Sequence, residues 1–159
     1  MKLRLALLAA TALAFTVPAI AADAPSYVAA AVSNADRSAE ETARDANRKP
    51  ADMVAFAGVK PGDKVLDLVP GKDAYFTHIF ANVVGSSGHV YSFMPTELDA
   101  AMAKRKPPIQ LPPDGTVDPK WPNVTFVHHS LTALNLPEKL DVVWTSQNYH
   151  DFHDKFMGP

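Results

Sequence analysis

Cysteine is absent from this 159-residue sequence, so neither a disulfide framework nor a thiolate metal site is possible. Lysine and arginine total 15 against 17 acidic residues, and they form no basic face. The densest basic run, AKRKPP at residues 103–108, is typical of a solvated loop. We therefore expect no binding to nucleic acids. A GxGxxG motif is also missing, which disfavours a nicotinamide oxidoreductase.

The N-terminus has the pattern of a secretory signal peptide. A positively charged start (MKLR) precedes an apolar run over residues 5–17, and small residues (AIA) follow at 19–21. The run is shorter than the roughly 20 residues that span a membrane. The pattern predicts a signal peptide over residues 1–21, with cleavage before Ala22 and export to the periplasm or beyond. No stable membrane span is expected after cleavage, and a retained N-terminal anchor is the alternative.

The rest of the chain is long enough for one domain with a hydrophobic core. Residues 22–33 are small and mixed in polarity, which predicts a flexible lead-in, and residues 34–159 would form the domain. Strand-length apolar runs alternate there with helical patterns. The expected helices cover residues 34–49, 50–57, 75–84 and 96–105, and another begins at residue 148. The expected strands cover residues 64–69, 89–93, 123–128 and 140–145.

These strands are rich in Val, Leu and Phe without clean polar alternation, which indicates burial on both faces. Their alternation with helices predicts an α/β fold with a Rossmann-like, mostly parallel sheet and helices on both faces. In such sheets, ligands bind at the carboxyl ends of the strands, near the point where the strand order reverses. The loop after the first strand, Pro70 to Ala74, is therefore the first candidate for a ligand site.

An ordered series of segments from residue 44 onward resembles the class I S-adenosylmethionine-dependent methyltransferases, and more closely an exported group of predicted methyltransferases. The segments are PGDKVLDL (61–68), YFT (75–77), VG..G.VY (84–91) and LDVVWTSQNYHD (140–151). The family's sheet has seven strands, and four are found here. The resemblance therefore implies a C-terminally truncated methyltransferase-like domain, the N-terminal part of a longer protein. A genuinely short, four-stranded homologue is the alternative.

The resemblance implies S-adenosylmethionine as the cofactor. The acid that ends the first strand, Asp67, and the loop residue Gly71 correspond to the positions that hold the methionine half. Glycine there lets the backbone approach a ligand and adopt positive φ. Backbone amides near Tyr75 and Thr77, at the start of the next helix, are expected to face the cofactor's carboxylate.

Three positions depart from the family's pattern. Lys72-Asp73-Ala74 replaces the glycine pair of the loop, and Lys72 either pairs with the cofactor's carboxylate or belongs to a solvated turn. The usual ribose-binding acid after the second strand is missing, and Glu97 is the nearest substitute. Ser130 follows the third strand, where an acid usually meets the adenine amine. The loop does not fit a phosphate-binding P-loop either, because PGKDA lacks the leading glycine and the Ser or Thr.

Polar residues after the fourth strand stand where methyltransferases often contact the substrate. Asn148 is predicted to bind the substrate, and His150 is the candidate base, with Asp151 or Tyr149 beside it. An ordinary histidine at a helix start is the alternative for His150. A metal site built from histidines is a further alternative, but no firm third ligand is present and none is predicted. The histidines concerned are His128, His129, His150 and His153.

Together these patterns predict an S-adenosylmethionine-dependent methyltransferase that acts on an unknown small-molecule substrate. The alternative is a non-catalytic periplasmic binding protein on a degenerate methyltransferase fold. The altered loop favours this alternative, while the retained VLDL, YFT and NYHD segments favour the enzyme.

Overall fold

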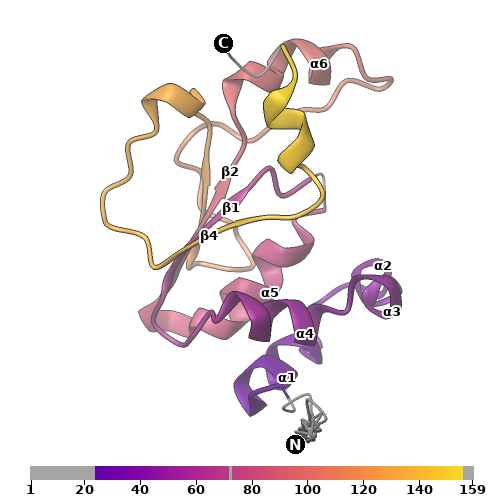
Figure 1. Ribbon diagram of the computed structural model, residues 1–159, viewed down its shortest axis with the longest axis vertical. Coiled ribbons are helices and arrows are strands. Elements are labelled where there is room, and N and C mark those ends of the chain that lie inside the picture. Colours follow the sequence, from indigo (N-terminus) through magenta and orange to yellow (C-terminus); the bar gives the residue numbers. More distant parts are fainter. Residues whose placement is uncertain (1–23, 72, 156–159) are drawn as a thin grey trace, which may run out of the picture.

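The computed structural model describes residues 24–71 and 73–155 (Figure 1). The predicted signal peptide and Lys72 lie outside the described residues. Four strands form one parallel sheet in the order β3-β2-β1-β4. The strands are β1 (Lys64–Leu68), β2 (His89–Phe93), β3 (Val124–Val127) and β4 (Val142–Thr145). The predicted α/β, Rossmann-like fold is confirmed.

The order of the strands places a switch point beside β1. The chain runs from β1 outward to β2 and β3, and it then returns to β4 on the other side of β1. In register, Val65 of β1 lies between Val90 of β2 and Val142 of β4. The strand order therefore reverses between β1 and β4, which is where open parallel sheets bind their ligands.

One face of the sheet is covered by helices. The helix α5 (Tyr75–Val84) packs on β1 and β2, and α1 (Ser26–Val32) and α4 (Pro50–Ala57) pack nearby (Figure 1). Apolar residues recur along α5 at helical spacing, and Ile79 and Phe80 are fully buried against the sheet. Gly58, in the left-handed conformation, ends α4 as the sequence predicts.

The opposite face is covered mainly by the segment between β3 and β4. Leu66, Tyr91, Phe93 and Val127 form its core, and leucines from residues 131–140 pack against them. This segment includes one 3-10 turn, η3 (Leu131–Ala133). Burial on both sides explains why these strands show no clean polar alternation.

The N-terminal helices differ from the prediction. Residues 26–32, predicted as part of a flexible lead-in, form α1, and its Val28 is fully buried among the other helices. The single helix predicted over residues 34–49 is two short helices, α2 (Ala39–Thr42) and α3 (Asp45–Arg48). Lys49 ends α3 in the left-handed conformation, and the proline that follows disfavours continuation of the right-handed helix through Lys49.

The helix that follows β2 is shorter than predicted, and the segment that follows β4 is a short 3-10 helix. A 3-10 turn, η2 (Thr96–Leu98), leads into α6 (Asp99–Ala103), and Pro95 rather than Thr96 occupies the position before η2. The segment after β4 forms the 3-10 helix η4 (Tyr149–His153). None of the helices in the described part of the chain is long and apolar enough to cross a membrane.

The connection between α5 and β2 depends on a glycine. It contains the 3-10 turn η1 (Gly85–Ser87), and Gly88 follows directly. A Cβ atom on Gly88 would lie 2.4 Å from Cβ of Val84 and 2.7 Å from the carbonyl oxygen of Asp63. Only glycine therefore lets the end of α5 approach β2 this closely, which positions the first turn of α5 at the other end of the sheet.

Candidate functional site

A cleft of about 770 Å³ opens at the carboxyl ends of β1 and β2, a volume that suits a ligand of cofactor size. Its walls are the loop after β1, the first turn of α5, the end of β2, α6 and the proline-rich segment that follows α6. Residues that matter for the chemistry below include Gly71, Thr77, His78, Ser92, Met94, Met102, Phe126, Asn148 and Asp151. The cleft therefore lies where the sequence places its first candidate site.

The loop after β1 has a strained backbone. Val69 has φ 58° and Ala74 has φ 45°, a left-handed region that a β-branched residue rarely adopts. The Val69 N–H donates to the carbonyl of Phe93 at 2.9 Å, and the Val69 carbonyl accepts a bond from Asn148 Nδ2 at 2.8 Å. Gly71 has φ 76°, which glycine tolerates. Strain that neighbouring strands hold in place is a feature of functional sites.

Asp67 lies beneath this loop and is 3% exposed. Its carboxylate accepts a hydrogen bond from Thr77 Oγ1 at 2.6 Å. Burial raises the pKa of Asp67 to about 6, although the bonds from Thr77 and the charge of Arg48 oppose this rise. Its contact with a cofactor stays a prediction.

A smaller pocket of about 90 Å³ lies at the switch point between β1 and β4. Asp67 and Gly71 line it together with Arg48 and Asn148. A carboxylate and a guanidinium in the same small pocket can bind an ammonium and a carboxylate of one ligand. The pocket thus joins residues from β1, the helical N-terminal segment and the loop after β4.

Arg48 is a site residue that the sequence interpretation missed. Its Nη2 donates to Gln147 Oε1 at 2.9 Å, and its guanidinium lies 4.9 Å from the ring centroid of Tyr75. The bond joins α3 to the loop after β4, across 99 positions of sequence. No local pattern reveals such a contact, because only the fold brings the two segments together.

The side chain of Tyr75 does not line the cleft. It is 1% exposed, and its hydroxyl donates to Asp45 Oδ1 at 2.5 Å. Burial and the Asp45 carboxylate raise the pKa of Tyr75 to about 12. The side chain therefore ties α5 to α3, while the predicted role of the amides at the start of α5 remains a prediction.

Glu97 and Ser130 bind each other. Ser130 Oγ donates to Glu97 Oε1 at 2.6 Å, and the Leu131 N–H donates to the same oxygen at 3.1 Å. The bond from Ser130 is the main reason that the pKa of Glu97 lies below its usual value. Neither side chain lines the cleft. The pair fastens the loop after β3 to η2, and its predicted contacts with the cofactor stay predictions.

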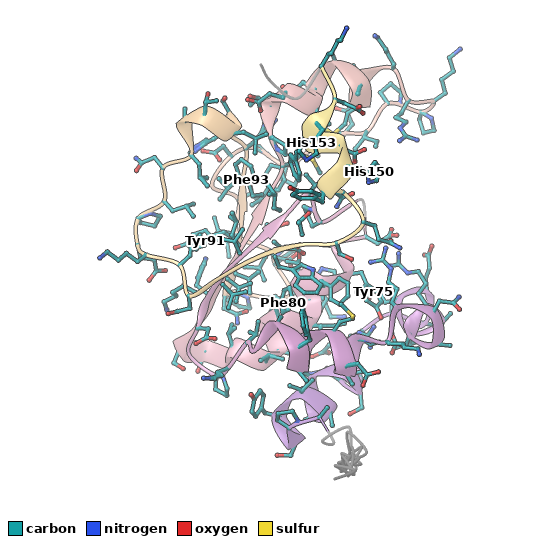
Figure 2. All side chains as sticks on the ribbon, viewed as in Figure 1. Tyr75, Phe80, Tyr91, Phe93, His150 and His153 are labelled. Atoms are coloured by element: carbon teal, nitrogen blue, oxygen red, sulfur yellow. The ribbon has the colours of Figure 1, made fainter. Side chains whose placement is uncertain are left out.

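The residues after β4 that were predicted to be catalytic or to bind the substrate separate into two groups. Asn148 and Asp151 line the cleft, and Asn148 lines the smaller pocket as well. Tyr149 is 69% exposed, and the side chain of His150 is 78% exposed with Nε2 3.2 Å from Asp151 Oδ1. His150 and His153 extend from η4 (Figure 2). The structure brings Asn148 and Asp151 to the cleft with Gly71 and Thr77, but not Tyr149 or His150.

His128 and His129, two histidines of the possible metal site, are each paired with an acid. His128 Nε2 lies 2.9 Å from Asp99 Oδ1, and His129 Nε2 lies 3.1 Å from Asp114 Oδ2. Within residues 24–71 and 73–155, no three His, Asp or Glu side chains are grouped in a way that would hold a metal ion. His78 is different, because it lines the cleft and pairs with the buried Glu41, and the sequence interpretation missed it.

Comparison with models of protein families and with curated proteins found no match. Among solved structures, the chain is similar to a protein-L-isoaspartate O-methyltransferase, with 23% identity over 60% of this chain and a TM-score of 0.39. The chain spans 27% of the length of that protein. The sheet order and the cleft themselves define the class: a Rossmann-like α/β protein with a cleft at the carboxyl edge of its sheet.

Proposed function

We propose that this protein binds S-adenosylmethionine and that a methyl group passes from it to a small molecule. The observation that carries the proposal is the position of the cleft. It lies against Gly71 and Thr77, within the segments that resemble the methyltransferases, and the buried Asp67 bonds to Thr77. Bound S-adenosylmethionine would supply an electrophilic methyl group, and the protein would supply position and proton transfer.

The residues present fit the two halves of this cofactor. Asp67 and Arg48 offer opposite charges to the ammonium and the carboxylate of the methionine half, in the pocket at the switch point. For the adenosine half, the cleft offers the apolar side chains of Met94, Met102 and Phe126, which form one cluster. Ser92 adds a hydroxyl to the same wall, where Glu97 does not reach.

A non-catalytic binding protein on the same fold is the second candidate. Two observations favour it: the family's glycine pair is replaced by residues 72–74, and Glu97 is engaged with Ser130. The predicted export also favours it, because S-adenosylmethionine is made in the cytosol. Binding of S-adenosylmethionine without methyl transfer would support this candidate.

Calorimetric titration with S-adenosylmethionine and S-adenosylhomocysteine tests the proposal directly. We expect both to bind, and Asp67→Ala to abolish the binding, because the ammonium loses its carboxylate partner. Arg48→Met should weaken the affinity by about tenfold or more, since it removes a charge-assisted hydrogen bond worth roughly 1.5–3 kcal/mol. Asp141→Asn is the matched control, because Asp141 bonds to the amide of Lys64 at the opposite end of β1. Failure of both compounds to bind at millimolar concentration would reject the proposal.

A further inference from the structure

His78 on α5 is held as an oriented imidazole. Its Nδ1 lies 2.6 Å from Glu41 Oε1, and its ring stacks on Trp121 with centroids 3.8 Å apart and an interplanar angle of 14°. The side chain is 15% exposed. Nε2 has no hydrogen-bond partner among the described residues. One nitrogen and one ring face are therefore occupied, while the second nitrogen is available to a ligand.

Glu41 is itself fixed in place. It is 5% exposed, and its Oε2 accepts the Ser38 N–H at 2.7 Å in the capping box of α2. Burial opposes its ionisation, but the hydrogen bonds with His78 and Ser38 lower the pKa of Glu41 overall. An ionised carboxylate on Nδ1 favours the tautomer with the proton at Nδ1, so Nε2 keeps a free lone pair.

His78 lines the cleft together with Gly71 and Asn148. On its other side it borders a groove whose charged side chains are Asp36, Glu40, Glu41, Asp73, Arg44 and Lys120. His78 follows Thr77, whose hydroxyl bonds to Asp67, so the first turn of α5 presents both residues to the same cleft. By contrast, the side chain of His150 is mostly exposed and lies outside the lining.

We propose that His78 is the general base of this cleft, that Glu41 and Trp121 are its positioning residues, and that the methyl acceptor is a hydroxyl compound. The inference rests on the proposed function. A hydroxyl keeps its proton at neutral pH, since even a phenol has a pKa of about 10, whereas a carboxylate needs no base.

In the proposed reaction the methyl group moves from sulfur to oxygen, and the hydroxyl proton moves to His78. A bond forms between the acceptor oxygen and the methyl carbon while the bond from that carbon to the sulfonium sulfur breaks, and the electron pair stays on sulfur. The hydroxyl proton passes to His78 Nε2. The Glu41 carboxylate, 2.6 Å from Nδ1, stabilises the imidazolium that results.

Diethyl pyrocarbonate, which acylates unprotonated imidazoles, tests whether Nε2 is available. Mass spectrometry resolves the rates for all six histidines of the chain. We expect His78 to react faster than His89, whose Nε2 is bonded to Thr125 Oγ1 at 2.8 Å. Glu41→Gln should slow the reaction of His78 by about tenfold, because it removes the carboxylate that holds the proton at Nδ1 and so leaves the lone pair of Nε2 free. His129, which pairs with Asp114 outside the cleft, is the control. A His78 rate at or below that of His89 would overturn the inference.

Nitrogen-15 spectra of the imidazoles test the tautomer and the acceptor class. We expect His78 to carry its proton at Nδ1, and Glu41→Gln to produce a mixture of tautomers. Phenol should shift the Nε2 resonance through a hydrogen bond, whereas benzoate, which has no hydroxyl proton, should not. Absence of a shift with phenol would reject the hydroxyl acceptor, and an Nε2-protonated tautomer would reject the base.

Failure of this inference can be told apart from failure of the proposed function. If S-adenosylmethionine does not bind to the unsubstituted protein, the proposed function is wrong whatever His78 does. If it binds but Nε2 is occluded, only the inference about His78 is wrong.

Discussion

Asp67 is an acid buried in the centre of a parallel sheet, and its environment gives it a distinct dependence on pH. Its pKa in the folded protein is about 6, above the value of about 3.9 for an unfolded chain. Stability linked to Asp67 is therefore fully present below about pH 3.9 and is lost as the pH rises through about 6. At neutral pH, the raised pKa of Asp67 therefore lowers the free energy of unfolding by about 3 kcal/mol, which is the penalty of burying the charge.

Asp67→Asn should relieve this penalty. Asparagine keeps an oxygen that accepts the hydrogen bond from Thr77 Oγ1, but it carries no charge to bury. Relative to the unsubstituted protein, the free energy of unfolding of the variant should rise by up to about 3 kcal/mol between pH 4 and pH 7.5. Urea denaturation at the two pH values measures this.

Asp141→Asn controls for the loss of an acid at an exposed position on the same sheet. Its free energy of unfolding, relative to that of the unsubstituted protein, should show no comparable rise over the same range of pH. If the difference in the free energy of unfolding between Asp67→Asn and the unsubstituted protein is the same at both pH values, burial of the charge does not raise the pKa of Asp67.

The sequence could predict Asp67 and Gly71 because both belong to a local pattern, a strand that ends in an acid followed by a glycine. It could not predict Arg48 or His78. Arg48 meets Gln147, and His78 meets Glu41 and Trp121, only after distant segments come together. Neither arginine nor histidine carries a local signal that separates a site residue from an ordinary surface residue.

Among the helices, the short N-terminal elements are joined to α5 through one carboxylate. Arg37 donates two hydrogen bonds to Asp45, at 2.7 and 2.9 Å, and its side chain is fully buried. It also donates to the carbonyl of Val32 at 2.6 Å, while the Tyr75 hydroxyl donates to Asp45. Asp45 thus links α1, α3 and α5. This link positions Glu41 in the groove beside His78, and Arg48 in the pocket at the switch point.

Asp45→Ala should loosen this whole group of helices. We expect a loss of about 3 kcal/mol in the free energy of unfolding, because the buried guanidinium of Arg37 is left without its partner. Amide hydrogen exchange should accelerate over residues 38–48. The hydrogen bond from Arg37 lowers the pKa of Asp45, so its stabilisation is present above about pH 3.9 and is lost as the pH falls through the lowered value.

Asp52→Ala provides the matched comparison, because Asp52 is an exposed acid in the first turn of α4. Its removal affects only the favourable charge at a helix start, worth about 0.3–1 kcal/mol. Equal losses for the two variants would mean that the Arg37–Asp45 pair does not hold the helices together.

The elements that the sequence predicts well are those with a strong local period. The helix over residues 75–84 and the strand over residues 89–93 have the predicted bounds. The helix predicted over residues 34–49 is wrong, since its composition favours helix throughout but gives no sign of the break between Thr42 and Asp45. Packing explains the break, because Asp45 at the start of α3 accepts a hydrogen bond from Tyr75 of α5. Packing against the other helices likewise orders α1.

At the scale of the whole molecule, export stays a prediction of the sequence. Expression of the full chain in a bacterial host should yield a periplasmic protein that begins at Ala22, as determined by N-terminal sequencing. Ala21→Trp should block the cleavage, because the residue before the cut must be small. Ala12→Leu, which keeps the apolar run apolar, should not. An unprocessed chain in the cytosolic fraction would contradict the prediction.

Local patterns in the sequence are enough to indicate the class of the fold and the place to look for a site. Apolar runs of strand length that alternate with helical periods indicate a parallel sheet, and the end of β1 is then the candidate site, because these patterns are local. The tertiary structure alone decided which side chains meet there. Arg48 joins Asp67 in one pocket, His78 joins Glu41 at the cleft, and Glu97 turns to Ser130, because such contacts depend on how distant segments pack.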